Sequence, residues 1–226
     1  MDATNATETQ PPCRFASFRS RQRCPVVWKT PSRSWAGILG RIVILAMGYF
    51  VMAWLAKAAT GYPHHPSFVW PAAGVALAGV LVWGARVWPG VVLGSVLVNL
   101  SFHASNVSSF APGSETVPVP EILWAGLGAA AQALFGRFLI TFLAAPPTSR
   151  WRERRFLWVM LILGPLSCLV NATWIIIGLE LVKGWTTPIE VMAQRILLWW
   201  IGDAVGLLLV APGLVIAAFE NDPRLR

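Results

Sequence analysis

Two long apolar runs follow each other in the middle of the chain, with the sequence WPAAGVALAGVLVWGARVWPGVVLGSVLVNL over residues 70–100. A short hinge with one charge, Arg86, joins them, and each is close to the roughly 17 to 25 residues that a helix needs to cross a bilayer. A third run, WWIGDAVGLLLVAPGLV over residues 199–215, holds an acid among apolar residues. A backbone in lipid must satisfy its own hydrogen bonds, so isolated apolar runs of this kind fold as helices. The sequence therefore predicts an all-α membrane protein.

The composition supports a protein that crosses the membrane several times. Only 12% of its 226 residues are charged and 56% are hydrophobic, whereas soluble domains carry about 25% charged residues. The net charge is +8, and most Lys and Arg residues lie outside the apolar runs, where they set the orientation of a membrane protein. Because this explains the positive charge, we expect no nucleic-acid partner. The three cysteines form no metal-binding pattern, and His64 and His65 suit the membrane interface. We find no motif of a hydrolase, a metalloprotease or a nucleotide-binding loop. We expect neither a metal site nor an enzyme, and no particular cofactor is indicated.

Six helices are predicted from the apolar runs and from the residues that interrupt them. They cover residues 36–57, 68–84, 88–102, 122–144, 156–182 and 196–219. The last helix is expected to start before its apolar part, because Thr187, Pro188 and Glu190 have the order of an N-cap, a first-turn proline and a capping-box acid. The fold class that we predict is a polytopic transmembrane bundle of about six helices.

The distribution of Lys and Arg predicts that both ends of the chain face the cytoplasm (N-in and C-in). Six of these residues fall in the polar segment 1–35, and four fall between the fourth and fifth helices. Only Lys57, Lys183 and Arg195 fall in the loops of the other side, and loops rich in positive charge remain cytoplasmic. We therefore expect a disordered basic tail at 1–35, a membrane domain at 36–219 and a cytoplasmic end at 220–226 that could link to an output domain.

Asp203 is the most informative polar residue inside an apolar run. It follows Arg195 by eight residues, which puts it roughly 12 Å along a helix that enters from outside. A lone carboxylate at that depth takes up a proton or finds a donor. Gly202 and Gly206 lie on either side in a pattern that allows close helix contact. Two interpretations stay open: Asp203 senses a ligand or a proton, or it only bonds a neighbouring helix.

Other polar residues are expected at a similar depth. The candidates for a ligand or signal site, together with Asp203, are Asn99, Asn171, Trp70, Gln132 and Glu180. If the helices pack as one bundle, these side chains could line a cavity that opens outward. Arg137, roughly two turns from the cytoplasmic end of its helix, could reach the headgroups or pair with an acid or a carbonyl.

Two ordered motifs resemble the first type of membrane-associated sensor domain, the MASE family of bacteria. One has Trp-Pro-x-x-Gly, then Gly-x-x-x-Trp-Pro-Gly, then Gly and Asn, and the other has Trp-Trp-x-Gly-Asp-Ala-x-Gly followed by Ala-Pro. The matching residues are Trp70, Pro71, Gly74, Trp88, Pro89, Gly90, Gly94 and Asn99 in the first motif, and Trp199, Trp200, Gly202, Asp203, Gly206 and Pro212 in the second. The resemblance covers residues 36–219. Apart from the polar candidates, we expect these residues to pack helices.

This resemblance implies a multi-pass input module of bacterial signalling in the cell inner membrane. Modules of this family pass a signal to GGDEF or EAL cyclic-di-GMP enzymes or to histidine kinases, and here such an output would be fused or act in trans. The lipid bilayer is a further expected partner, and the module could also form a homodimer. Two alternatives stay open: a small transporter, which polar groups near the midplane would suit, and a scaffold that recruits a partner through its basic tail.

Overall fold

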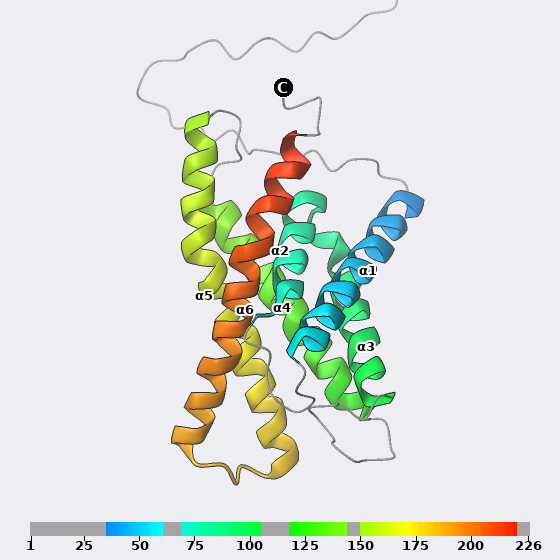
Figure 1. Ribbon diagram of the computed structural model, residues 1–226, viewed down its shortest axis with the longest axis vertical. Coiled ribbons are helices and arrows are strands. Elements are labelled where there is room, and N and C mark those ends of the chain that lie inside the picture. The colour runs from blue at the N-terminus through cyan, green and yellow to red at the C-terminus, as the bar shows by residue number, and fades with distance from the viewer. Residues whose placement is uncertain (1–34, 61–68, 105–117, 144–149, 221–226) are drawn as a thin grey trace, which may run out of the picture.

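The computed structural model describes residues 35–60, 69–104, 118–143 and 150–220, and within these ranges all regular structure is helical (Figure 1). The helices are α1 (Trp35–Thr60), α2 (Pro71–Trp83), α3 (Trp88–Ala104), α4 (Val119–Leu143), α5 (Arg150–Lys183) and α6 (Ile189–Glu220), with a 3-10 turn, η1 (Ala85–Val87), before α3. The predicted all-α bundle of about six helices is confirmed. Most of the predicted tail and cytoplasmic end, and the pair His64 and His65, lie outside the described residues.

Five of these helices, α1, α3 with η1, α4, α5 and α6, are long and apolar enough to cross a membrane. The start of α1 and the end of α6 lie at the same end of the bundle (Figure 1). We call this the terminal end, and we call the other end, where α5 turns into α6, the far end. The charge distribution predicts that the terminal end faces the cytoplasm. Large apolar side chains such as Phe142, Trp158 and Ile162 are exposed on the outside of the bundle, as contact with lipid requires.

The second helix differs from its prediction as a full span. α2 has 13 residues, which extend about 20 Å and cannot cross a hydrocarbon core of about 30 Å. It starts at Pro71 instead of residue 68, because proline suits the first helical turn and Trp70 before it has a non-helical backbone. It ends at Trp83, where Gly84 adopts a positive φ of 92° that only glycine reaches easily. α2 is therefore a half-length helix.

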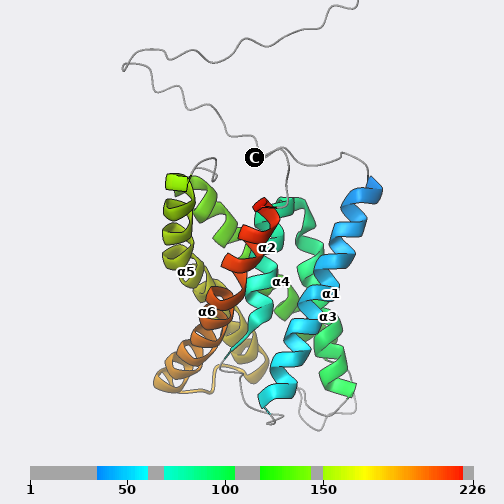
Figure 2. The same ribbon diagram turned by 45° about the horizontal axis from the view of Figure 1, so that its top comes forward.

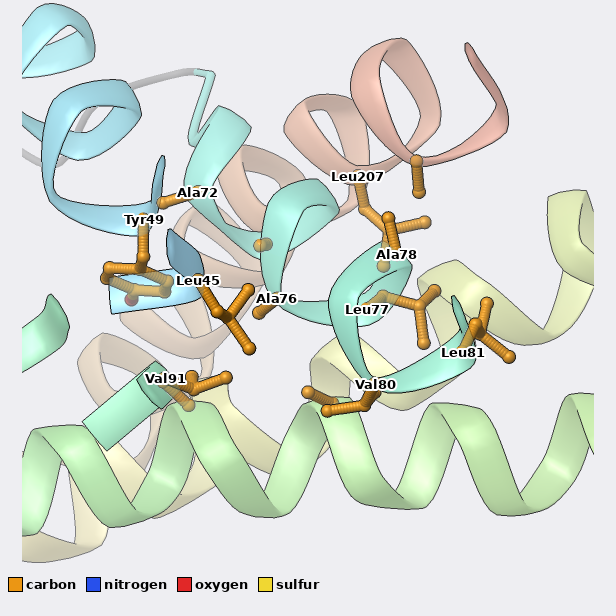
Figure 3. Packing of buried hydrophobic residues seen from close by; sticks show 14 of the residues in the cluster. Leu45, Tyr49, Ala72, Ala76, Leu77, Ala78, Val80, Leu81, Val91 and Leu207 are labelled. Carbon is orange, nitrogen blue, oxygen red and sulfur yellow. The ribbon is translucent and has the colours of Figure 1, made fainter. Parts of the chain in front are cut away.

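α2 lies in the middle of the bundle, between the α1–α3 pair and the α5–α6 pair (Figure 1, Figure 2). It packs most extensively against α6, and then against α1 and α4. Figure 3 shows buried side chains around it, with Leu45 and Tyr49 from α1, Val91 from α3 and Leu207 from α6. Small residues cover much of its buried surface, namely Ala72, Ala73, Gly74, Ala76, Ala78 and Gly79. Helices in lipid associate mainly through close packing, so this surface lets α2 fit among its neighbours.

Two motif glycines set the distance between α1 and α3. A Cβ added to Gly90 would lie 2.6 Å from the Ile42 carbonyl oxygen, and one added to Gly94 would lie 2.7 Å from the Ala46 carbonyl oxygen. Both obstacles are backbone atoms, which cannot move aside as a flexible side chain can. α3 therefore packs directly on the backbone of α1 at these positions.

Candidate functional site

The start of α2 meets α6 inside the bundle. The N–H of Trp70 donates a hydrogen bond to the carbonyl of Gly202 at 2.9 Å, and a Cβ on Gly206 would collide with the Trp70 carbonyl group. Gly202 lies near the middle of the 32-residue α6, so the chain enters α2 at mid-depth. Non-helical backbone at membrane depth is tolerated only where protein buries it or a cavity hydrates it. Here α6 itself supplies a partner for the Trp70 backbone.

Asp203 lies beside this junction and is almost completely buried, with 2% of its surface exposed. Its Oδ2 accepts a hydrogen bond from Asn171 Nδ2 of α5 at 2.9 Å. The Asn171 Oδ1 atom is also buried and has no hydrogen-bond partner among the described residues. A second bond between the two helices runs from Trp200 Nε1 to the Pro165 carbonyl at 2.7 Å. α5 and α6 are thus joined by polar contacts close to the start of α2.

Tyr49 of α1 completes the other side of the junction. Side-chain hydrogen bonds join this buried tyrosine to Trp70 and to Ser95 of α3, and Asp203 is close enough to interact with it electrostatically. Asn99 is connected to the group because its Nδ2 donates to the Ser95 carbonyl at 2.8 Å. The junction therefore joins α1 and α3 to Trp70 at the start of α2, near the carboxylate that bonds α5.

The group extends to α4 through a cysteine. Gln132 Nε2 contacts Cys168 Sγ at 3.2 Å, and Cys168 is near enough to Asp203 for an electrostatic interaction. Gln132 Oε1 is buried and, like Asn171 Oδ1, has no hydrogen-bond partner within the described helices. Two buried acceptors without donors on the α4–α5 contact are a typical setting for an internal water molecule.

We name this group the central polar cluster, which consists of Tyr49, Trp70, Ser95, Gln132, Cys168, Asn171 and Asp203. Four predicted candidates meet in it, namely Asp203, Asn171, Trp70 and Gln132, while Asn99 lies at its edge. Sequence reasoning did not single out Tyr49, Ser95 or Cys168. A signal existed for the first two, because Tyr49 is one of only two tyrosines and Ser95 precedes the candidate Asn99 by one helical turn.

Glu180 lies apart from the cluster, at the far end where α5 turns into α6. Its fully buried carboxylate accepts a bond from the Thr187 N–H at 3.4 Å through Oε2, and its Oε1 lies 3.7 Å from Arg195 Nη1. The predicted capping box is wrong. α6 begins at Ile189 and the Pro188 carbonyl accepts its first backbone bonds, so Pro188 is the N-cap instead of Thr187. The Thr187 N–H bonds Glu180 rather than Glu190. Gly184 and Trp185 both have positive φ, which makes the turn after α5 tight. The Glu180 carboxylate stabilises this turn by accepting the Thr187 N–H. In this structure Glu180 contacts the turn that joins the two longest helices.

Arg137 of α4 binds the end of α2. Its Nη1 donates to the carbonyls of Val80 at 2.7 Å and Leu81 at 3.2 Å. These belong to the last turn of α2, where the helix dipole is negative. The Val80 carbonyl also accepts the Gly84 N–H at 3.1 Å. Of the alternatives for this arginine, the structure shows pairing with carbonyls. Both ends of α2 are therefore fixed by polar contacts, one from α6 and one from α4.

Replacing Arg137 with methionine should destabilise the bundle, because buried carbonyls at the end of α2 lose a charged donor. Loss of such a bond typically costs about 1.5 to 3 kcal/mol. The measurement is the free energy of unfolding in mixed micelles titrated with SDS. Arg86→Met is the control, since Arg86 is exposed in η1. Equal losses for the two variants would contradict this role of Arg137.

Among the described residues, no group of three or more His, Cys, Asp or Glu side chains could hold a metal ion. The comparison with protein families gives a match: the family model described as MASE1 matches residues 41–226. No curated protein matches the chain, and no solved structure does. The matched range includes both sequence motifs and every residue of the central polar cluster.

Proposed function

Because this chain belongs to the MASE1 family of membrane sensory domains, we propose that it is the input part of a bacterial signalling system in the inner membrane. The signal would act at the central polar cluster. The output would be a cytoplasmic cyclic-di-GMP enzyme or a histidine kinase, fused to the chain or acting in trans. Contact with the lipid bilayer follows from the five apolar helices, and the identity of the output partner is part of the proposal.

The observation that carries the proposal is the position of Asp203. A carboxylate buried inside a membrane bundle is costly, and such residues usually mark functional sites. Asp203 bonds Asn171 of α5 and lies beside the start of α2, so a change in its bonding alters the contacts of several helices together. A signal can shift the bundle only if it binds two packings unequally. A tenfold preference corresponds to about 1.4 kcal/mol, which one polar contact can supply.

α6 offers a route from the cluster to the terminal end. It carries Asp203 near its middle and continues to Glu220. Pro212 lies within the helix between these two positions, and proline removes a backbone bond and allows a bend. We propose that repacking around Asp203 changes the direction or rotation of the last turns of α6, to which an output domain responds.

A transporter is the second candidate, and one observation favours it. α2 is a half-length helix whose start lies at mid-depth, and many transporters place such half-helices at their substrate sites. A transporter moves substrate across a sealed membrane, whereas a sensory domain does not. Uptake of labelled organic anions and cations into proteoliposomes that contain the purified chain separates the two functions.

The test of the proposed function is a fusion of the full chain to a diguanylate cyclase placed after Arg226. Asp203→Asn keeps the shape of the side chain but changes its bonding, so we expect cyclic-di-GMP production to change by about tenfold. Glu190→Gln is the matched control, because it makes the same chemical change on an exposed position of α6. Equal output from both variants and the parent, at equal amounts of folded protein, would overturn the role of Asp203.

A further inference from the structure

A pocket lies at the far end of the bundle, between the first turns of α4 and the last turns of α5. Its volume is about 170 Å³, and apolar side chains such as Ile175, Leu181 and Val182 make most of its wall. Glu121, half-buried in the first turn of α4, lies at the polar edge of this lining. The pocket is outside the central polar cluster, and the contacts described so far do not account for it.

Gly178 and Trp124 form the floor of the pocket, and Trp174 supports Trp124 from behind. A Cβ on Gly178 would collide with the Trp124 indole, so the absence of a side chain there lets this ring lie against α5. Trp124 Nε1 donates to the Trp174 carbonyl at 2.8 Å, and Trp174 Nε1 donates to the Trp124 carbonyl at 2.9 Å. The two rings stack with centroids 4.3 Å apart. Because both indole donors are satisfied, the pocket has a fixed and apolar floor.

The side chains around the pocket indicate what fills it. Leu181 and Val182, with 56% and 66% of their surface exposed, end the span Phe156–Val182, and Glu121 is near the start of the span Val119–Leu143. The pocket therefore faces lipid at the boundary between headgroups and hydrocarbon. An apolar cavity of about 150 Å³ excludes water and takes a ligand of the size of benzene, so this pocket can take part of a hydrocarbon chain.

We propose that the pocket binds the acyl chain of a phospholipid whose headgroup carries an amine. The chain occupies the space beside Trp124, and the headgroup ammonium lies near the Glu121 carboxylate, which attracts an amine and repels an anionic headgroup. The charge distribution predicts that the far end is the outer side, so the lipid comes from the outer leaflet.

The pocket is connected to the central polar cluster through one glycine of α4. A Cβ on Gly128 would lie 2.5 Å from Trp174 Cδ1 and 2.7 Å from Asn171 Oδ1. Trp174, which stacks on the pocket residue Trp124, and Asn171, which bonds Asp203, therefore both lie against Gly128 of α4. A chain that separates α4 from α5 at the pocket changes the contact of Asn171 with Asp203. This consequence rests on the proposed function, whereas binding of the lipid does not.

The test uses the full chain in vesicles of phosphatidylethanolamine and phosphatidylglycerol, with a trace of either lipid carrying a photoreactive acyl chain. Adducts are mapped by mass spectrometry. We expect the phosphatidylethanolamine probe to label the pocket residues of α4 and α5 at least about threefold more than the phosphatidylglycerol probe. Val182→Trp should remove most of this labelling because it fills the pocket. Ile162→Trp is the matched control, since Ile162 is equally exposed on α5, at 66%, outside the pocket.

Labelling spread evenly along the exposed side of α5, equal labelling by the two probes, or equal labelling of the two tryptophan variants would each overturn the lipid site. These outcomes leave the proposed function in place, because the cyclase fusion tests Asp203 separately. In that fusion, Val182→Trp should shift cyclase output and Ile162→Trp should not. Unchanged output with lost labelling would overturn the connection between the pocket and the cluster.

Discussion

Adding one methyl group at Gly206 is expected to lower the free energy of unfolding of the bundle by more than about 3 kcal/mol. The new Cβ would occupy the space of the Trp70 carbonyl group, and neither backbone can move without breaking the bond from the Trp70 N–H to the Gly202 carbonyl. Overpacking of a core costs about 1 to 3 kcal/mol when side chains can adjust, and here the obstacle is backbone. The loss exceeds the gain of about 1 kcal/mol that alanine brings to a helix in place of glycine.

Gly213→Ala on the same helix is the matched control. A Cβ added to Gly213 would meet no atom of a neighbouring helix within 4 Å, so this change should leave stability equal or slightly higher. SDS titration of both variants, followed by tryptophan fluorescence, measures the difference. If Gly206→Ala were as stable as Gly213→Ala, the start of α2 would not be seated on α6 in the membrane.

The helices could be predicted because lipid leaves the backbone few choices. An apolar run without internal partners must become a helix, and the predicted boundaries of α3 and α4 lie within three residues of the observed ones. The depth of α2 could not be predicted in this way. Its start is fixed by the bond between Trp70 and Gly202, a contact between segments far apart in the sequence. Composition alone treats residues 68–70 as apolar and extends the helix through them.

The site could be predicted in part for a related reason. Asp203, Asn171 and Gln132 stand out because polar groups in lipid are costly. Tyr49 and Ser95 do not stand out, since tyrosine and serine are ordinary in apolar helices. Which faces of two helices pack together depends on small residues. Gly94 is an example, because it lets α3 pack closely on α1 beside Tyr49. Glu180 lies apart from the predicted group, because its partners are Trp185 and Thr187 of the adjoining turn and Arg195 of α6.

The second large effect is expected at the bond between Asn171 and Asp203. Asn171→Ala removes the donor and leaves the carboxyl group of Asp203 buried at 2% exposure, and loss of a hydrogen bond to such a group costs about 1.5 to 3 kcal/mol. Asp203→Ala should cost less, because the remaining amide is neutral. The double variant should be more stable than the sum of the two losses predicts, with an interaction energy of about 1 to 3 kcal/mol. SDS titration of the four proteins measures this cycle.

The same four proteins, fused to the cyclase, separate the two interpretations of Asp203. If the pair only holds α5 to α6, the double variant recovers stability and keeps the cyclase output of the parent. If the pair is the element that a signal shifts, the double variant folds but has an output fixed at one level, since the two packings no longer differ at this bond. We expect the second result, because Asp203 directly follows Gly202, whose carbonyl accepts the Trp70 N–H at the start of α2, so a change at this bond reaches a third helix. An interaction energy near zero would mean that the hydrogen bond does not couple the two helices, and neither interpretation would then hold.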